Sequence, residues 1–242
     1  MKTIDLKISG NRTHDIDIYL NEDRYDKPKE YFKVISDLIE KRCGDSESLA
    51  DVGCATGEYL YYIKERYPKI KRMVGIDNVD KLLAAARKKL PEIEFYIGDL
   101  ENNLFQEEEK FDVVTCFGVM PCVFHLENAI NNLLNLLSPN GHLFLFALAN
   151  EEPIDVQLVY KRSNKEENIW EVGKNCYSLE TYGKILSSRC RKVEVLDFDL
   201  PFSIAKTNDP LRSWTEEFRG KKNHLFYGTG QIATQKIIIA AT

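Results

Sequence analysis

A glycine-punctuated stretch that directly follows an apolar run constrains this chain more than any other part of its sequence. The run spans residues 49–52 and includes an acid, Asp51, and glycines follow at positions 53 and 57. Glycine is typical of positions where the backbone turns sharply or approaches a ligand closely, because a Cβ would clash there. The stretch therefore predicts a buried strand, a tight turn and a helix start. The acid predicts a ligand that presents positive or hydrogen-bond-donating groups.

The glycine-rich motif that this stretch approaches most closely is the dinucleotide-binding fingerprint, and the spacing of the glycines distinguishes the stretch from it. That fingerprint has glycines at its first, third and sixth positions, and the sixth allows the helix to pack closely on the strand. Counted from Gly53, the third position is Ala55 and the sixth is Glu58. A glutamate is too large for that contact and has the wrong charge to face a pyrophosphate. An NAD site is disfavoured, whereas an ordinary strand–turn–helix connection stays open on this stretch alone.

Three later apolar runs end in residues that suit the same ligand edge. Residues 73–77 end in Asp77, residues 93–99 end in Gly98 and Asp99, and residues 111–119 end in a turn of small residues. In a doubly wound fold, an acid at the tip of the second strand can accept hydrogen bonds from ribose hydroxyls. Four strand ends with this chemistry in this order are not well explained as unrelated caps and solvated loops.

Together these strand ends resemble those of class I methyltransferases that use S-adenosylmethionine (SAM), over roughly residues 31–148. The resemblance implies SAM as the cofactor and S-adenosylhomocysteine (SAH) as its product. It implies cofactor contacts at the methionine moiety (Asp51, Gly53, Cys54, Ala55, Gly57), the ribose (Asp77 and the adjacent Asn78), the adenine (Asp99, Leu100) and the sulfonium side (Phe117). Many relatives have glycine where this chain has Ala55, and we expect that alanine to keep a negative φ.

The whole chain alternates strands and helices, which predicts an α/β fold with a doubly wound, mostly parallel seven-stranded sheet. Helices are expected at about residues 32–43, 57–66, 79–89, 126–137 and 178–189, and the last three strands at 142–149, 193–200 and 233–241. We expect a single domain over residues 31–242, after an N-terminal extension of residues 1–30. Insertions are expected at about 151–177 and 201–230, and the second contains a C-terminal β-hairpin at 213–227.

Two regions outside the core leave alternatives open. The alternation of acidic and apolar residues at 15–20 suits either a short strand or a flap over the cofactor. Trp170 and Trp214, one in each insertion, suit either stacking on an acceptor or the burial of hairpin faces. The first insertion is the better acceptor-site candidate, because loops that leave the fourth and fifth strands open at the ligand edge.

Composition and charge limit the classes of binding partner and the cellular compartment that we expect for this protein. The formal net charge is −5 with acids and bases interleaved, which argues against nucleic acid as the main substrate. The apolar run at 142–149 is too short to cross a bilayer, and residues 1–6 lack the pattern of a secretory signal. The six cysteines include no Cys-x-x-Cys pair. We therefore expect reduced thiols in a cytoplasmic protein, with no zinc site and no membrane partner.

The catalytic residue is expected to be His125. Methyl transfer is an in-line displacement at a carbon that the sulfonium already activates, so the protein mainly aligns the nucleophile with the methyl group. A hydroxyl acceptor also needs a general base within hydrogen-bond reach. His125 follows the fourth strand in a context that resembles a histidine common in the family, and Tyr177 and His224 are weaker alternatives.

The acceptor is expected to be a small polar molecule, methylated on a hydroxyl of a sugar or of a glycan-linked group. Two alternatives stay open: N-methylation of a small metabolite, and a protein that binds SAM or SAH without turnover. No metal is expected, because Asp197, Asp199 and Asp209 lie in strand and turn contexts that suit solvated positions. The sequence does not indicate an oligomeric state.

Overall fold

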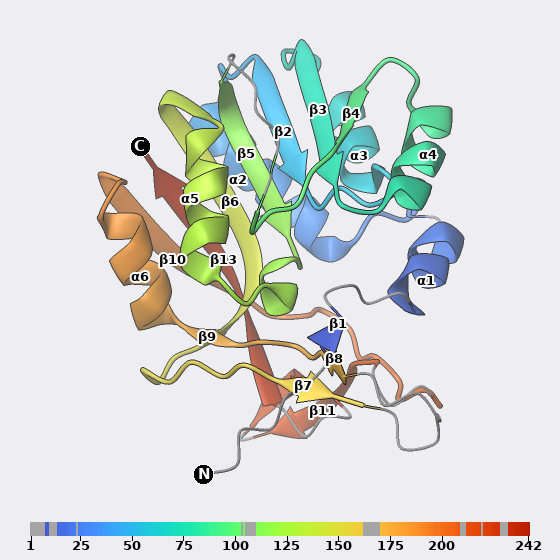
Figure 1. Ribbon diagram of the computed structural model, residues 1–242, viewed down its shortest axis with the longest axis vertical. Coiled ribbons are helices and arrows are strands. Elements are labelled where there is room, and N and C mark those ends of the chain that lie inside the picture. The colour runs from blue at the N-terminus through green and yellow to red at the C-terminus, as the bar shows by residue number, and fades with distance from the viewer. Residues whose placement is uncertain are drawn as a thin grey trace.

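The computed structural model describes residues 8–9, 14–22, 24–102, 104, 110–161, 170–208, 212–218, 220–227 and 232–242. A 10-stranded central sheet carries helices on both faces (Figure 1). Five strands are parallel in the order β4-β3-β2-β5-β6, and β13 and then β10 continue the sheet in antiparallel orientation. Their bounds are Ser48–Val52 (β2), Arg72–Asp77 (β3), Glu94–Ile97 (β4), Phe111–Phe117 (β5), Leu137–Asn150 (β6), Lys192–Phe198 (β10) and Ile232–Ala241 (β13). The predicted doubly wound, mostly parallel sheet is confirmed.

Successive residues of the central strands supply two hydrophobic cores, one on each face of the sheet. Leu49 belongs to the core under helices α2, α3 and α4, and its neighbour Ala50 belongs to the core under α5 and α6. The helices are Glu30–Cys43 (α2), Glu58–Arg66 (α3), Asp80–Lys89 (α4), Leu126–Asn135 (α5) and Leu179–Ser187 (α6). Ser178 caps α6 by accepting a 3.1 Å hydrogen bond from the N–H of Thr181. The predicted helices are confirmed to within two residues at each end.

The two insertions form smaller β structure. In the first, β8 (Trp170–Val172) pairs with β7 (Val159–Tyr160) and with β1 (Ile8–Ser9) from the N-terminal extension. In the second, β11 (Trp214–Phe218) and β12 (Lys221–Phe226) form the predicted antiparallel hairpin, whose β12 pairs with β13. Figure 1 places this β structure beyond the carboxyl ends of β2 and β5, so the insertions border the ligand edge.

The N-terminal extension contains a helix, α1 (His14–Glu22), so the short-strand interpretation of residues 15–20 is wrong. Ile16, Tyr19 and Leu20 recur three and four positions apart, and this spacing fits one face of a helix as well as alternation fits a strand. The helix packs against α4, which supplies the partner that decides between the two.

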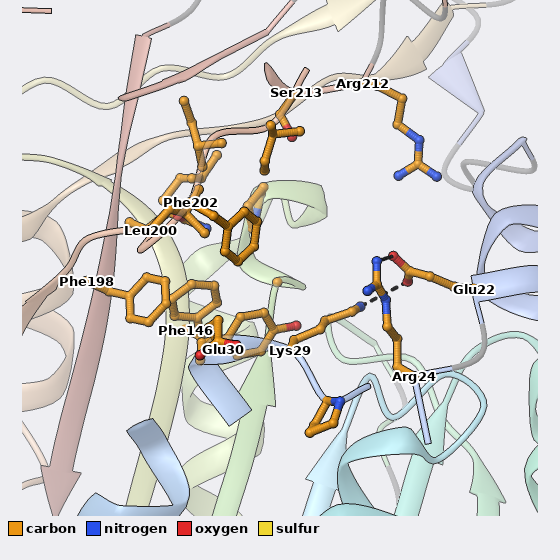
Figure 2. A pocket seen from close by; sticks show the side chains of 18 of the residues that line it. Glu22, Arg24, Lys29, Glu30, Phe146, Phe198, Leu200, Phe202, Arg212 and Ser213 are labelled. Carbon is orange, nitrogen blue, oxygen red and sulfur yellow. Dashed lines mark hydrogen bonds and ion pairs between the residues drawn. The ribbon is translucent and has the colours of Figure 1, made fainter. Parts of the chain in front are cut away.

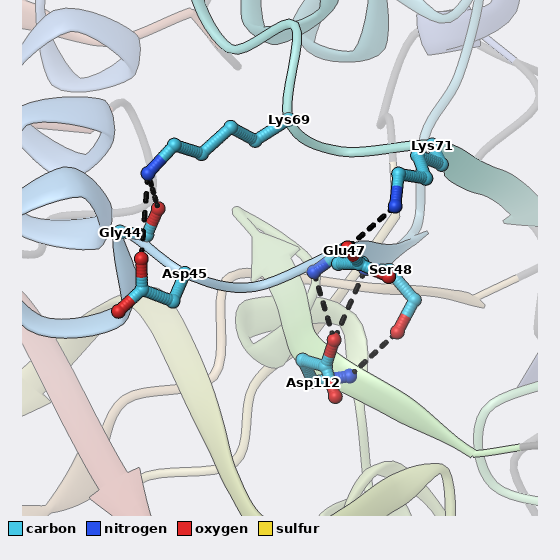
Figure 3. A network of polar contacts seen from close by, with 7 residues as sticks. All are labelled: Gly44, Asp45, Glu47, Ser48, Lys69, Lys71 and Asp112. Atoms are coloured by element: carbon cyan, nitrogen blue, oxygen red, sulfur yellow. Dashed lines mark hydrogen bonds and ion pairs between the residues drawn. The ribbon is translucent and has the colours of Figure 1, made fainter.

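Polar contacts join the segments that lead into the strands at the amino-terminal edge of the sheet (Figure 3). The Asp112 carboxylate accepts hydrogen bonds from the backbone N–H groups of Glu47 (2.9 Å) and Ser48 (3.2 Å). The Ser48 hydroxyl in turn accepts one from the N–H of Asp112, and Lys71 pairs with Glu47. Side chains of the protein itself therefore satisfy the polar groups at this edge.

Within the described ranges, no helix is long and apolar enough to cross a membrane. The six cysteines are free thiols, of which Cys54, Cys116 and Cys190 are buried and Cys43, Cys122 and Cys176 are half-buried. Burial raises the pKa of the Cys54 and Cys116 thiols well above its ordinary value, so neither thiol is activated as a nucleophile.

Candidate active site

A cavity of about 470 Å³ opens at the carboxyl ends of β2, β3 and β5, and we call it the cofactor cavity. An open α/β sheet binds its ligands at this edge. Of the predicted cofactor contacts, its lining includes Asp51, Gly53, Cys54, Ala55, Asp77, Asn78, Leu100 and Phe117. Helix α1 adds Ile16 and Tyr19, so the N-terminal extension also borders the cavity.

The turn after β2 depends on glycine at two positions. Gly53 has a φ of +78°, and a Cβ there would lie 2.2 Å from Cγ2 of Val119. Gly57 has a φ of +82° and directly precedes α3 as its N-cap residue, and a Cβ there would lie 3.1 Å from Leu90. Gly57 is absent from the cavity lining, so its role in the structure is to shape the turn.

Ala55 has a φ of +48°, so the expectation that it keeps a negative φ is wrong. The left-handed conformation costs a non-glycine residue roughly 1–2 kcal/mol. The N–H of Ala55 donates a 2.9 Å hydrogen bond to Oδ2 of Asp77, which offsets part of this strain. The turn is therefore locally strained where its backbone contacts Asp77, the acid at the end of β3.

Asp77 ends β3 with its side chain at the cavity wall and only 8% exposed. Its two oxygens accept one backbone hydrogen bond each, from Ala55 and from Val79, both at 2.9 Å. Burial raises the pKa of this carboxyl, against the lowering effect of the backbone N–H groups. Each carboxylate oxygen has more than one lone pair, so this acid can still accept hydroxyl hydrogen bonds from a ligand.

Asp51 lies deeper in the cofactor cavity and is 3% exposed. Its Oδ1 accepts a 2.7 Å hydrogen bond from the Thr115 hydroxyl. Burial raises the pKa of Asp51 to about 7, the Thr115 hydrogen bond opposes this, and the nearby Asp77 adds to it. Among the described residues no cation forms an ion pair with Asp51, so this carboxyl suits a ligand that brings its own positive charge.

Of the two residues predicted to contact the adenine, Asp99 and Leu100, only Leu100 lines the cofactor cavity. Gly98 and Leu100 line the cavity, but Asp99 between them does not. Its Oδ1 accepts a 2.9 Å hydrogen bond from the N–H of Glu101, and its Oδ2 accepts a 3.0 Å bond from the Asn102 amide. The Asp99 carboxylate therefore caps its own turn in this structure.

A second cavity of about 870 Å³ adjoins the first, and we call it the acceptor cavity. The two cavities share Tyr19, Lys29, Tyr31, Gly118 and Cys122, which we call the junction. Figure 2 shows an apolar wall formed by Phe146, Phe198, Leu200 and Phe202, and charged side chains, including Glu22, Arg24, Lys29 and Arg212, across from it.

Tyr31 occupies the junction within an aromatic cluster. Its ring stacks on Phe146 at 4.1 Å between centroids and meets Phe117 edge-on at 5.8 Å. Burial raises the pKa of the Tyr31 hydroxyl far above its ordinary value, and the charge of Glu22 adds to the effect. The hydroxyl is therefore protonated at neutral pH.

The N-terminal segment contacts the turn after β2 and the start of α3, and no motif in the sequence predicts this role. The Tyr25 hydroxyl donates a 2.6 Å hydrogen bond to the carbonyl of Thr56, and the Arg24 N–H donates a 2.8 Å bond to Glu58. Glu22 also forms ion pairs with Arg24 (2.9 Å) and Lys29 (3.2 Å). The mixed aromatic and charged composition of residues 19–31 was the only available signal.

The predicted general bases lie elsewhere. His125 is exposed and lines neither cavity, and its backbone N–H donates a 2.6 Å hydrogen bond to Glu101. The Tyr177 hydroxyl is used in a 2.6 Å hydrogen bond to the carbonyl of Val123. His224 lies in the hairpin against Phe218, outside the lining of both cavities.

The described part of the chain contains no group of three or more side chains arranged to hold a metal ion. Asp197 pairs with the buried Lys236 at 2.6 Å, and Asp199 is exposed. Asp209, the third acid considered for a metal cluster, lies outside the described residues.

A doubly wound sheet with this glycine turn and these buried acids defines the fold of class I SAM-dependent methyltransferases. A family model described as a methyltransferase domain matches residues 44–217. The chain belongs to this methyltransferase family, whose cofactor is SAM.

Two curated relatives show the range of similarity. The chain is 32% identical over 108 residues to dTDP-4-amino-2,3,4,6-tetradeoxy-D-glucose N,N-dimethyltransferase of Saccharopolyspora spinosa. The matched region covers 43% of this chain and 41% of that protein. It is 28% identical over 205 residues to tRNA U34 carboxymethyltransferase of Helicobacter acinonychis, and this matched region covers 78% of this chain and 74% of that protein. Several curated relatives are matched over about half of their length, from 41% to 54%.

Solved structures agree on the fold. SAM-bound CalS10, an amino pentose methyltransferase from Micromonospora echinaspora, matches with a TM-score of 0.57 and 17% identity over 100% of both chains. At this level of identity the match establishes the shared architecture only.

Proposed function

We propose that this protein transfers the methyl group of SAM to an amino nitrogen of a small, sugar-type acceptor. The observation that carries the proposal is the pair of adjoining cavities, one lined by the predicted cofactor residues and the other open to an acceptor. SAM supplies a methyl group made electrophilic by its sulfonium. The protein then has to align a nucleophile with that methyl group, and the junction is where the two ligands would meet.

The residues of the cofactor cavity fit SAM. Asp51 is a buried acid without an ion-pair partner among the described residues, which suits a ligand that carries an ammonium and a sulfonium. Asp77 offers acceptor lone pairs to the ribose hydroxyls, and Leu100 and Phe117 offer apolar surface to the adenine and the methionine moiety. We propose the same contacts for Gly53, Cys54, Ala55 and Asn78, which line the cavity beside them.

The composition of the junction favours a nitrogen nucleophile over a hydroxyl. A neutral amine has a lone pair ready to attack, whereas a hydroxyl needs a base to take its proton. The junction residues include neither a histidine nor a carboxylate. Glu22, which lines the acceptor cavity nearby, is paired with Arg24 and Lys29, which lower the pKa of its carboxyl despite the opposing effect of burial. A carboxylate with a lowered pKa is a weak base for a hydroxyl.

Tyr31 is proposed to orient the acceptor. Its raised pKa keeps the hydroxyl protonated, so the side chain can exchange a hydrogen bond with the nucleophile but cannot deprotonate it. Two relatives support an amino acceptor, since the Saccharopolyspora protein is named an N,N-dimethyltransferase of an amino sugar nucleotide and CalS10 an amino pentose methyltransferase.

Methylation assays on a matched pair of acceptors test the proposal. The protein would be incubated with isotope-labelled SAM and either an amino sugar or its hydroxyl analogue, and methylated product would be detected by mass spectrometry. We expect transfer to the amine alone, and we expect Tyr31→Phe to lower kcat by about tenfold without changing the Kd of SAH. Transfer to the hydroxyl analogue alone would contradict the amino assignment. SAH binding without transfer to any acceptor of this type would contradict the proposed reaction.

A further inference from the structure

The acceptor cavity has two chemically different sides. On one side lie charged residues of the N-terminal segment and of α2, among which Glu22 forms ion pairs with Arg24 and Lys29. On the other side lies the apolar wall of Phe146, Phe198, Leu200 and Phe202 (Figure 2). A ligand that fills this cavity therefore meets charge on one side and apolar surface on the other.

The way in which β10 ends accounts for three residues of the apolar wall. Phe198 is the last residue of β10, and Leu200 and Phe202 follow it at alternate positions. In an extended chain, alternate side chains point to the same side. All three line the acceptor cavity, whereas Asp199 is exposed and lines neither this cavity nor the cofactor cavity. The chain that leaves β10 thus presents an apolar face to the acceptor cavity.

The β-hairpin of the second insertion fixes this chain in place. The Asn223 amide donates a 2.9 Å hydrogen bond to the carbonyl of Leu200, and its Oδ1 accepts a 2.8 Å bond from the Ser203 hydroxyl. The N–H of Ile204 donates a 2.8 Å bond to the Thr215 hydroxyl, and the N–H of Thr215 donates a 3.0 Å bond to the carbonyl of Ile204. These polar groups are therefore engaged by β11 and β12, and the apolar side chains remain for a ligand.

Phe202 is the aromatic residue that this wall leaves open. The rings of Phe146 and Phe198 are buried and pack edge to face at 5.2 Å between centroids. Phe202 is 49% exposed and forms no ring pair with any described residue. Trp170 and Trp214, the aromatic residues considered from the sequence as stacking surfaces, do not line this cavity. Covering the Phe202 ring with an apolar group is favourable, because it removes apolar area from water.

The apolar wall begins at the junction and extends away from it. Phe146 stacks on the junction residue Tyr31 at 4.1 Å between centroids, and Figure 2 shows Phe202 farther out along the wall. The cavity volume is about 870 Å³, against about 470 Å³ for the cofactor cavity. An acceptor whose nucleophilic nitrogen lies at the junction would therefore place the rest of the molecule along this wall.

We propose that the acceptor is an amino sugar that carries an apolar aglycone, whose amino group lies at the junction and whose apolar group packs on Leu200 and Phe202. This inference rests on the proposed function, because it assumes that the acceptor occupies this cavity. A nucleobase is another flat group that a sugar can carry. Its edge bears donors and acceptors that lose water on burial, and the polar groups of residues 200–204 described above are already engaged.

Calorimetric titration of the SAH-loaded protein tests the inference without turnover. The probes are the methyl, cyclohexyl and phenyl glycosides of glucosamine, and thymidine. We expect the cyclohexyl and phenyl glycosides to bind at least tenfold more tightly than the methyl glycoside and thymidine, with a more negative change in heat capacity, because they bury more apolar area. Equal affinities of the three glycosides, or no detectable binding of any of them, would overturn the inference. Tightest binding of thymidine would replace the apolar subsite with a nucleobase site.

Variants locate the subsite. Phe202→Ser should weaken the binding of the phenyl glycoside at least tenfold, and Phe202→Leu should recover part of this loss, because leucine restores apolar area. Val195→Ser is the matched control, since Val195 is 40% exposed on β10 and lines neither cavity. It should change the affinity less than twofold. Equal losses in Phe202→Ser and Val195→Ser would contradict a specific subsite at Phe202.

The failure of this inference is separable from the failure of the proposed function. SAH binding in the same titrations reports the cofactor cavity, and methyl transfer to the free amino sugar reports the reaction. If both are observed while the apolar glycosides show no gain in affinity, the reaction stands and the aglycone assignment fails. Preferential binding of the apolar glycosides without transfer to their amino group would support the subsite and contradict the reaction.

Discussion

Asp112 is the second residue of β5, and Asp51 lies near the end of the neighbouring strand β2, so the two carboxyls mark opposite edges of one sheet. Burial acts to raise the pKa of both. At Asp112, hydrogen bonds from the N–H groups of Glu47 and Ser48 and from hydroxyls outweigh burial, so its pKa is lowered. At Asp51 burial prevails, and its pKa rises to about 7.

The difference between these two carboxyls separates a structural edge from a functional one. The amino edge shown in Figure 3 satisfies its acid with groups of the protein, so its polar contacts contribute to folding. At the carboxyl edge, strands β2 and β3 carry the buried acids Asp51 and Asp77, and no cation of the described residues pairs with either. Buried charges without partners are costly, and a ligand that supplies the missing charge recovers that cost on binding.

The largest expected effect is on cofactor affinity at the carboxyl edge. Asp77→Ala should weaken SAM binding by about 2–4 kcal/mol, because two charge-assisted hydrogen bonds to the ribose are lost. Calorimetry would measure the Kd of SAM, and thermal denaturation would show whether the variant is folded. An unchanged Kd in a folded variant would mean that the ribose contact is misassigned.

The matched change at the amino edge should act on stability alone. Asp112→Ala leaves the N–H groups of Glu47 and Ser48 without their acceptor and should cost about 2 kcal/mol of the free energy of unfolding. Its Tm should therefore fall by several degrees, while the Kd of SAM stays within twofold of the parent value. A variant that loses SAM affinity but keeps its Tm would break the distinction between the two edges.

The pH dependence of the carboxyl edge has opposite signs for stability and for binding. The folded-state pKa of Asp51 is about 7 against an ordinary value of 3.8, so the folded protein binds more protons than the unfolded chain between these values. The contribution of Asp51 therefore makes the ligand-free protein less stable as pH rises through this window. The ionised acid suits a cationic ligand, so SAM should bind about tenfold more tightly at pH 8 than at pH 6.

Asp51→Asn is the control for this titration. The variant should show neither the loss of stability nor the gain in SAM affinity between pH 6 and pH 8 that Asp51 causes. A pH dependence of SAM affinity that persists in the variant would assign it to another group.

The smallest expected effect concerns the strained turn. Ala55→Gly removes the Cβ from a residue with a φ of +48° and should stabilise the protein by about 0.5–1 kcal/mol, after the greater unfolded-state entropy of glycine is taken into account. Denaturant unfolding would measure the change. A loss of stability would mean that the Cβ makes contacts worth more than the strain.

The strand ends of the fold could be predicted because their signals are local. Each core strand contains an apolar run, and at four of them an acid or glycine at the end identifies the ligand edge without knowledge of the rest of the chain. The seven core strands and the hairpin were predicted on this basis and are confirmed. Helix α1 was not, because Ile16, Ile18 and Leu20 alternate as in a strand while Ile16, Tyr19 and Leu20 recur as on one face of a helix. Only packing against α4 decides between the two.

The acceptor cavity could not be predicted from the sequence. Its charged side chains come from residues 22–33, 174 and 212, and only the folded chain brings them together. The backbone of Ala55 and the turn-capping role of Asp99 likewise depend on contacts that a motif does not encode. His125 illustrates the same limit, since its sequence context matched the family while its side chain lies outside both cavities.

The central claim is that the carboxyl edge of the sheet is a SAM site. Calorimetric titration of the purified protein with SAH and, separately, with NAD tests it most directly. The account predicts binding of SAH with a micromolar or lower Kd, and no detectable heat with NAD. Binding of NAD without binding of SAH would contradict it.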